Sequence, residues 1–241
     1  MAEQSSGGRR VAFFGGSFDP PHLGHLAVAR AAQAALGLDT VLFAPVGAQP
    51  LKPQGSTASY EDRLALTRLA IAGDAGFAVS LADAPRPGGA PNYTLDTLEE
   101  LREELPRGSA LFCLMGADSF FGLRRWHRAA EIPFVAPLIV ASRPGQLLEG
   151  LKAALPEGLY LESGPAGDQT VAGVEMRACI LRNAAGQTSP FYLLPGLNVE
   201  ISASDIRAGI QAAIDGESGC QELLPGPVFE AIRSRGLYRQ G

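Results

Sequence analysis

Short apolar segments alternate with helical segments along the first 141 residues of this 241-residue chain. The apolar segments lack a polar face, as do strands buried within a parallel sheet, and the segments between them have helical periodicity. Spacing of this kind is typical of βαβ units and predicts a doubly wound, parallel α/β sheet. The expected strands are 10–14, 40–45, 77–81, 110–115 and 134–141, and the expected helices are 23–36, 60–72 and 94–105.

The remainder of the chain has weaker patterns. Segment 145–190 is rich in glycine, proline and alanine, with possible strands near 159–161 and 178–181, and we interpret it as an irregular insertion. Helices expected at 205–214 and 227–234 would form a small C-terminal helical part. The polar residues 1–9 are expected to be flexible, so the sequence predicts a single domain over 10–241.

Composition limits the classes of partner. The net charge of −5 is unfavourable for nucleic-acid binding, although a few cations in a cleft can still hold a small anion. Cys113, Cys179 and Cys220 form no CxxC pair, so we expect small buried side chains rather than disulfides or a zinc site. No secretory signal precedes Val11 and no apolar run would span a membrane, which favours a soluble cytoplasmic protein.

The segment GGSFDPPHLGH, residues 15–25, follows the first expected strand and opens the first expected helix. Gly15 and Gly16 would let the backbone adopt conformations closed to other residues and approach a ligand closely. Ser17 offers a hydroxyl and a backbone N–H to phosphate, and the two prolines stiffen the turn. Ligands of parallel α/β sheets bind beyond the carboxyl ends of strands, so this loop and the loop at Gly116 are candidate site loops.

Two histidines stand three residues apart at the expected start of the first helix. His22 and His25 would share one helix face, and Gly24 between them leaves room for a ribose or a base. The unpaired N–H groups and the positive dipole end of the helix complete an anion site. Zinc is the weaker interpretation, because the only other histidine is His127 and no third ligand lies nearby in the sequence.

This motif resembles the signature of the class I nucleotidyltransferases, in which an HxGH element holds ATP phosphates. Its residue pattern is similar to that of the bacterial nicotinate mononucleotide adenylyltransferases. Residues 201–207, ISASDIR, are similar to a second signature of that family, I-S-S-T-x-I-R. Ser202 and Ser204 would cap a helix and donate to phosphate, and Arg207 would supply a cationic fork. Ala203 replaces a family serine and would contribute only its backbone.

A third resemblance covers residues 92–98, NYTLDTL, which are similar to the family's S-Y-T-x-D-T-L. The family's tyrosine and threonine line the nicotinate pocket, which implies the same role for Tyr93 and Thr94. Asn92 departs from the usual serine. The alternative is that Thr94, together with Thr97, only starts a helix.

Further family matches follow the later strands. Asp118, in a GAD segment after the fourth expected strand, would face ribose hydroxyls or the bound nucleotide. Trp126 lies in a segment similar to the family's L-x-x-W and would stack on the pyridine ring, although a lone tryptophan is equally suited to the core. His127 stands where relatives often carry an aromatic residue, which leaves the shape of the pocket open.

Two basic side chains also match the family. Lys52 is similar to the lysine of the family's P-P-H-K loop and would meet a phosphate, although Leu51 replaces the histidine of that loop. Arg143, in SRPG after the fifth expected strand, matches an arginine that would reach ATP phosphates, with a surface role as the alternative. The C-terminal LPGPVFEAIRSRGLY also resembles the family's ending and is interpreted as structural.

The resemblance implies a Rossmann-like fold and transfer of an adenylyl group from ATP to nicotinate mononucleotide, which gives deamido-NAD and pyrophosphate in NAD biosynthesis. Mg²⁺ would bridge phosphate oxygens, held mainly by substrate and water, so no protein ligand is named. The implied catalytic residues are His22, His25 and Arg207. The implied ATP-binding residues are Gly15, Gly16, Ser17, Phe18, Gly24, Gly116, Asp118, Arg143, Ser202 and Ser204, and the implied substrate-binding residues are Lys52, Tyr93, Thr94 and Trp126.

Two other functions remain open at this stage. One is adenylyl transfer to nicotinamide mononucleotide or to phosphopantetheine, of which the NYTLDTL segment and Trp126 argue against the second. The other is a nucleotide-binding regulator that has lost catalysis, against which the retained His22, His25 and Arg207 argue. The sequence does not reveal the oligomeric state.

Overall fold

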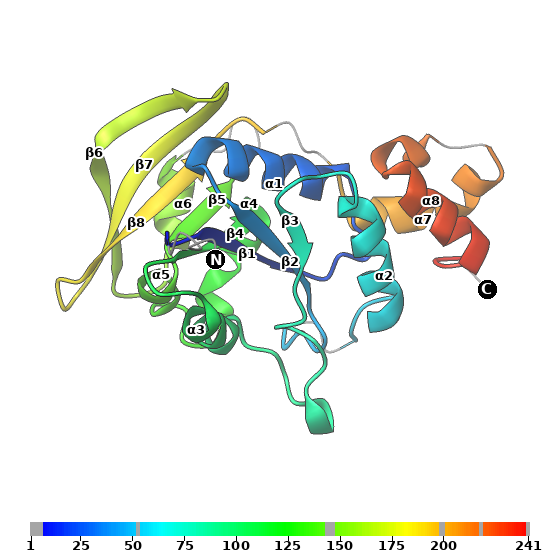
Figure 1. The fold of residues 1–241 in the computed structure, drawn as a ribbon, viewed down its shortest axis with the longest axis horizontal. Helices are drawn as coiled ribbons and strands as arrows, with labels where there is room; N and C mark the ends of the chain where they lie inside the picture. The colour runs from blue at the N-terminus through cyan, green and yellow to red at the C-terminus, as the bar shows by residue number, and fades with distance from the viewer. Residues whose placement is uncertain (1–6, 52–53, 143–147, 198–200, 217–218, 240–241) are drawn as a thin grey trace, which may run out of the picture.

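The computed structural model describes residues 7–51, 54–142, 148–197, 201–216 and 219–239 (Figure 1). Within these residues the centre of the molecule is an eight-stranded sheet of order β3-β2-β1-β4-β5-β8-β7-β6. The strands are β1 (Arg10–Gly16), β2 (Thr40–Pro45), β3 (Phe77–Val79), β4 (Ala110–Gly116), β5 (Leu138–Ala141), β6 (Leu159–Val171), β7 (Val174–Asn183) and β8 (Thr188–Leu194). All pairs from β3 to β8 are parallel, as expected. The sheet winds outward from β1 in both directions, so its topological switch point lies between β1 and β4.

Helices cover both faces of the sheet, and α1 and α3 lie on opposite faces (Figure 1). The helices are α1 (Leu23–Leu36), α2 (Tyr60–Ile71), α3 (Thr94–Glu104), α4 (Ala117–Phe121), α5 (Ile132–Val135), α6 (Leu148–Ala154), α7 (Ala203–Ile214) and α8 (Gly226–Arg235). Short 3₁₀ turns are η1 (Pro87–Gly89), η2 (Leu123–Arg125) and η3 (Cys220–Leu223).

The central strands supply two cores because their side chains alternate between the faces. In β1, Ala12 and Phe14 join the cluster beneath α1, α2, α7 and α8. Val11 and Phe13 of the same strand join the cluster beneath α3 to α6. Burial on both faces explains why the strands of the first 141 residues appear in the sequence as continuous apolar runs.

The expected strand at 134–141 is wrong over its first half. Residues Ile132–Val135 form the short helix α5, and β5 begins only at Leu138. Pro133 stands in the first turn of α5, where its fixed φ suits a helix and no N–H is needed. The single apolar run therefore contains two elements, which periodicity alone does not separate.

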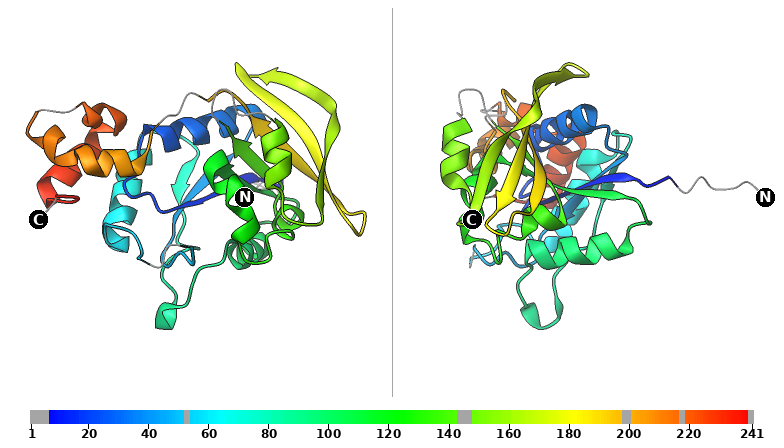
Figure 2. Two further views of the ribbon diagram at one scale, coloured as in Figure 1. Left: turned by 180° about the vertical axis from the view of Figure 1, so that it is seen from behind. Right: turned by 90° about the vertical axis from the view of Figure 1, so that its left-hand side faces the viewer.

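The possible strands near 159–161 and 178–181 lie within β6 and β7, but the expectation that the segment as a whole is irregular is wrong over its described residues, 148–190. Strands β6 and β7 form an antiparallel hairpin that extends the sheet at the end opposite α7 and α8 (Figure 2), and β8 returns parallel to β5. Ala172 and Gly173 both have positive φ, at 49° and 80°, which is typical of a tight two-residue hairpin turn. A Cβ on Gly164 would stand 2.3 Å from the carbonyl oxygen of Ala178. Glycines that suggested irregularity are thus required by the close approach and the turn.

Smaller differences concern a helix start and the cysteines. The helix expected at 205–214 begins at Ala203, because the Ser202 side chain accepts a hydrogen bond from the Asp205 N–H as its N-cap. Cys113 and Cys179 are buried free thiols, as expected, whereas Cys220 is half-buried. Among the helices described, none combines the length and apolar character needed to cross a bilayer.

Candidate functional site

A cavity of about 610 Å³ opens at the carboxyl ends of β1 and β4, at the switch point of the sheet. Open parallel sheets bind their ligands in such a position. The cavity walls contain every expected site residue that the structure describes: Gly15, Gly16, Ser17, Phe18, His22, Gly24, His25, Tyr93, Thr94, Gly116, Asp118, Trp126, Ser202, Ser204 and Arg207. The two remaining expected residues, Lys52 and Arg143, lie outside the described residues.

The rings of His22 and His25 lie against each other at the N-terminus of α1. Their centroids are 3.7 Å apart and their planes make an angle of 29°. The backbone N–H of His22, the residue that precedes the helix, donates to Nδ1 of His25 at 3.2 Å. A neutral imidazole that accepts at Nδ1 carries its proton on Nε2, so His25 keeps an Nε2–H donor for a ligand.

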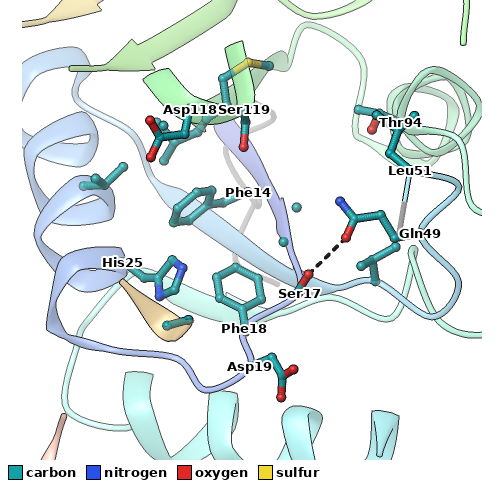
Figure 3. A pocket seen from close by; sticks show the side chains of 18 of the residues that line it. Phe14, Ser17, Phe18, Asp19, His25, Gln49, Leu51, Thr94, Asp118 and Ser119 are labelled. Atoms are coloured by element: carbon teal, nitrogen blue, oxygen red, sulfur yellow. Dashed lines mark hydrogen bonds between the residues drawn. The ribbon is translucent and has the colours of Figure 1, made fainter. Parts of the chain in front are cut away.

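Burial keeps both imidazoles uncharged near neutral pH. It lowers the pKa of His22 from 6.5 to about 4. Burial, and secondarily the neighbouring His22, lowers the pKa of His25 well below 6.5. The rings of Phe14 and Phe18 pack beside His25, with centroids 6.1 Å and 4.9 Å from its own (Figure 3). The pair therefore offers N–H donors to an anion rather than a permanent positive charge.

The carboxylate of Asp19 anchors the loop between β1 and α1. Its Oδ2 accepts from the backbone N–H of Thr57 at 2.6 Å, and its Oδ1 accepts from that of Ala58 at 3.1 Å. The hydroxyl of Tyr238 donates to the same Oδ1 at 2.8 Å. Burial, followed by the charge of Asp19, raises the pKa of Tyr238, so the hydroxyl remains a donor. The C-terminal segment is thus bonded directly to the first motif.

Arg63 of α2 is a buried guanidinium that donates to three backbone carbonyl groups. Nη1 donates to Ser17 at 2.7 Å, Nη2 to Val46 at 2.8 Å, and Nε to Ala58 at 3.3 Å. The Ser17 hydroxyl is also bonded to Oε1 of Gln49 at 3.1 Å (Figure 3). These contacts hold together the loops that follow β1 and β2 and the segment that enters α2.

Arg207 joins the second motif to the first. Its Nη1 donates to the carbonyl oxygen of Asp19 at 2.7 Å, and its Nη2 donates to Oγ of Ser204 at 3.1 Å. A guanidinium carries five N–H donors, so others are left for a ligand. Two segments that are 188 residues apart in the sequence therefore face the same cavity in a fixed relation.

The expected role of the two glycines needs correction. Gly15 and Gly16 belong to β1 and have no φ in the left-handed region, so they do not adopt conformations closed to other residues. A Cβ on Gly15 would stand 2.8 Å from the ring of Phe13, and one on Gly16 would stand 3.2 Å from that of Phe18. The glycines are needed for space, and the positive φ in this loop, 46°, belongs to Phe18.

The expected substrate residues gather around the start of α3, and Figure 3 shows Thr94 across the cavity from His25. The ring of Tyr93 lies 4.4 Å from that of His127, with 32° between the planes. Trp126 is a half-buried residue of the cavity wall rather than a fully buried core residue. The tyrosine, tryptophan and histidine rings give this end of the cavity flat surfaces against which a planar ligand can pack.

Asn92 is buried beside this aromatic group and clamps two loops together. Its Oδ1 accepts from the backbone N–H of Ala48 at 3.0 Å, and its Nδ2 donates to the carbonyl oxygen of Ala84 at 2.9 Å. A serine hydroxyl is shorter than this amide, so the departure from the family pattern has a structural use. Helix α3 begins at Thr94, as the structural alternative for this residue expects, but its N-cap residue is Tyr93 and no side chain caps the helix.

The polar groups near β4 include an exposed carboxylate and a buried thiol. Asp118 is exposed to the cavity at the start of α4 (Figure 3). Burial, and secondarily Asp83, raises the pKa of the Cys113 thiol to about 12, which excludes a thiolate nucleophile near neutral pH. In the part of the chain that the structure describes, no group of three His, Cys, Asp or Glu side chains could hold a metal ion.

Sequence reasoning missed the residues that support the site: Asp19, Arg63, Asp83 and Tyr238. Arg63 had a detectable signal, because it occupies the buried stripe of α2 with Leu66, Thr67 and Ala70. A charged residue in such a stripe requires buried partners. The bond between Tyr238 and Asp19 joins residues 219 positions apart and leaves no local pattern in the sequence.

Comparisons with known proteins place this architecture among nucleotidyltransferases. The family model described as cytidylyltransferase-like matches residues 13–209. A probable nicotinate-nucleotide adenylyltransferase of Gloeobacter violaceus is 38% identical over 96% of this chain and 97% of its own length. One of Trichlorobacter lovleyi is 34% identical over 95% of this chain and 99% of its own length.

Solved structures agree at the level of fold. A Plasmodium falciparum nicotinic acid mononucleotide adenylyltransferase complexed with NaAD superposes with a TM-score of 0.65 at 14% identity, over 95% of this chain and 97% of its own. The same enzyme complexed with APC gives a TM-score of 0.64 at 13% identity over the same shares.

Replacement of Arg63 tests whether its guanidinium holds the loops of the site. Arg63→Ala would leave the carbonyl groups of Ser17 and Val46 buried without their donor, so we expect the free energy of unfolding to fall by about 3 kcal/mol. Chemical denaturation measures this change. Arg68→Ala, which removes an exposed arginine of the same helix, should cost less than about 0.5 kcal/mol; equal losses in the two variants would contradict the role.

The buried histidines predict a fall in stability at acid pH. The pKa of His22 is about 4 in the folded chain against 6.5 in the unfolded chain, so only the unfolded state gains a proton between these values. Its contribution is complete above pH 6.5 and decreases toward pH 4, by about 3 kcal/mol in total. Unfolding of wild type and His22→Asn should therefore show a steeper decrease for wild type over this window. Parallel curves would show that His22 is not held neutral.

Proposed function

The chain belongs to the cytidylyltransferase-like family as one of its nicotinate-nucleotide adenylyltransferases, and from this premise we propose how its own residues carry out the reaction. ATP and nicotinate mononucleotide react to give deamido-NAD and pyrophosphate, a step of NAD biosynthesis. The observation that carries the proposal is the bond between Arg207 and the Asp19 carbonyl oxygen, which joins both phosphate-binding motifs at one cavity.

The nucleophile is the 5′-phosphate of the mononucleotide. One of its oxygens forms a bond to the α-phosphorus of ATP while the bond from that phosphorus to the bridging oxygen breaks, and pyrophosphate leaves. The phosphate is already anionic near pH 7, so no general base is required. The protein's task is to align two anions and to stabilise the negative charge that grows on the transferring and leaving oxygens.

We assign the α- and β-phosphates to His22 and His25. Because both rings are neutral, each can donate one N–H without the repulsion that two stacked imidazolium ions would suffer. Arg207 and the backbone of residues 202–204 lie at the β/γ end, where the guanidinium offers its remaining N–H groups. Gly15, Gly16 and Gly24, with Ser17 and Phe18, form the floor along which the triphosphate runs, and Gly116 and Asp118 face a ribose.

The mononucleotide occupies the opposite end of the cavity. Tyr93 and Thr94 border the ring, and Trp126 offers a face for stacking. The phosphate contacts of Lys52 and Arg143 remain predictions, because both residues lie outside the described residues. Mg²⁺ bound with ATP would supply neutralisation of the triphosphate charge, held mainly by substrate and water, and no protein ligand is assigned to it. A cytoplasmic location also remains a prediction.

Pyrophosphate release with ATP and each candidate acceptor tests the function. We expect nicotinate mononucleotide to give the highest kcat/KM, followed by nicotinamide mononucleotide, with no turnover of phosphopantetheine. Preferred turnover of phosphopantetheine would contradict the assignment, and ATP binding without turnover of any acceptor would favour an inactive regulator.

Replacement of His25 tests the phosphate contact. His25→Ala removes a donor aimed at developing charge, so kcat should fall about a hundredfold or more with the fold intact. Steady-state kinetics and a thermal melt measure both properties. Arg30→Ala, on the exposed face of the same helix, should leave kcat within about twofold because its surface ion pair with Asp74 contributes little. A folded His25→Ala variant with wild-type kcat would remove His25 from the reaction.

A further inference from the structure

The carboxyl group of Asp83 is a buried acid in the cavity wall that the proposed reaction leaves without a role. Asp83 lies in the loop after β3 and is 5% exposed. Its backbone carbonyl accepts from the N–H of Gly47 at 2.7 Å, which fixes the loop. The fixed loop thus places the side chain at the wall of the cavity.

Two contacts locate this carboxyl group at the substrate end. Its Oδ1 accepts from the hydroxyl of Thr97 at 2.6 Å, and that hydroxyl also lies 3.3 Å from the carbonyl oxygen of Tyr93. Its Oδ2 stands 3.5 Å from the position that a Cβ on Gly15 would occupy. The group therefore lies between the end of β1 and the first turn of α3, next to the residues assigned to the pyridine ring.

The surroundings leave the charge of Asp83 poorly compensated. Burial raises the pKa of Asp83, whereas the Thr97 hydroxyl and, more weakly, Arg86 lower it. Arg86 is itself paired with Glu100, at 3.5 Å. In the described part of the chain, the side chain accepts a hydrogen bond from one group, the Thr97 hydroxyl. A buried carboxylate in this state gains from a cation delivered by a ligand.

The ring of nicotinate mononucleotide carries such a cation at its nitrogen, in addition to the carboxylate on a ring carbon, which the oxidised and reduced forms share. Its ring nitrogen forms the glycosidic bond and is a quaternary pyridinium nitrogen with a permanent positive charge. We propose that Asp83 is the counter-ion of this pyridinium ring and makes the site selective for the oxidised, positively charged ring. This inference rests on the proposed function, since it takes the mononucleotide as the ligand.

Among the described residues, the cavity wall contains two other carboxylates, Asp19 and Asp118, which are less suited to this role. Both oxygens of Asp19 already accept hydrogen bonds, from Thr57, Ala58 and Tyr238. Asp118 stands at the start of α4, and Figure 3 shows it well apart from Thr94. Asp83 is the carboxylate whose partner, Thr97, lies one helical turn from Thr94.

The test compares two ring forms that differ in charge. Calorimetric titration gives Kd for nicotinate mononucleotide and for its 1,4-dihydro form, whose ring nitrogen is neutral, with wild type and Asp83→Asn. The asparagine keeps the size and can accept from Thr97, so the variant removes mainly the charge. We expect Asp83→Asn to weaken binding of the oxidised form about tenfold and of the reduced form less than about twofold. The KM for ATP should not change.

Asp96→Asn is the matched control, because it also removes one negative charge, from a residue of α3 that does not line the cavity. Both Kd values of this variant should match those of wild type. If Asp83→Asn does not fold, Asp83→Ser replaces it in the same titrations. The two Kd values of wild type are a further readout, because wild type should bind the oxidised form about tenfold more tightly than the reduced form.

Equal losses for both ring forms, or no loss for either, would overturn the inference while turnover of nicotinate mononucleotide by wild type still supported the proposed function. A wild type that neither binds nor adenylylates any mononucleotide would overturn the proposed function and this inference together.

Discussion

The carboxylate of Asp19 is the contact on which the geometry of the site depends. It accepts hydrogen bonds from Thr57 and Ala58, which enter α2, and from Tyr238 near the C-terminus. The carbonyl oxygen of the same residue accepts from Arg207. One residue of the first motif is therefore bonded to the start of the second helix, to the second motif and to the last segment of the fold. The loop between β1 and α1 therefore takes its shape from tertiary contacts rather than from its own sequence alone.

This arrangement explains how an acidic chain can hold two anions. Among the residues that the structure describes, no lysine lines the cavity. The wall contains neutral imidazoles buried at a helix N-terminus, the exposed Arg125, and the half-buried Arg207, whose guanidinium is partly occupied by protein oxygens. The buried guanidinium of Arg63 satisfies carbonyl groups of the loops and does not line the cavity. Fixed N–H donors require little reorganisation when charge develops, which is the condition for electrostatic stabilisation of a phosphoryl transition state.

The sequence predicts the first part of the fold well because its strands are buried on both faces and its helices end at recognisable signals. The helix 23–36 and the strand 40–45 agree with α1 and β2 at both ends. The β6–β7 hairpin was not predictable in the same way. It is a ribbon at the edge of the sheet, its turn uses Ala172 in place of the residues that usually mark such turns, and its register shifts between Ser163 and Asp168.

The residues of the candidate site also differ in whether the sequence alone could predict them. Residues within the two short motifs could be found from spacing and residue type, because a loop and a helix N-terminus are local structures. Asp83 and Tyr238 act through side-chain partners 14 and 219 positions away, and Arg63 reaches Ser17 and Val46, 46 and 17 positions away, so only the folded chain brings these groups together. The aromatic rings of the cavity wall are intermediate, because a resemblance suggested Tyr93 and Trp126, but the contact between Tyr93 and His127 joins the residue before α3 to a residue that follows η2.

The surrounding fold keeps the imidazoles of His22 and His25 uncharged at the N-terminus of α1. Nitrogen-15 NMR of the protein labelled at its histidines, recorded at pH 7 before and after addition of ATP, measures this state. We expect both rings to be neutral in the free protein, with the proton of His25 on Nε2, and ATP to shift the resonances of both rings. An imidazolium signal from either residue in the free protein at pH 7, or rings unaffected by ATP, would contradict it.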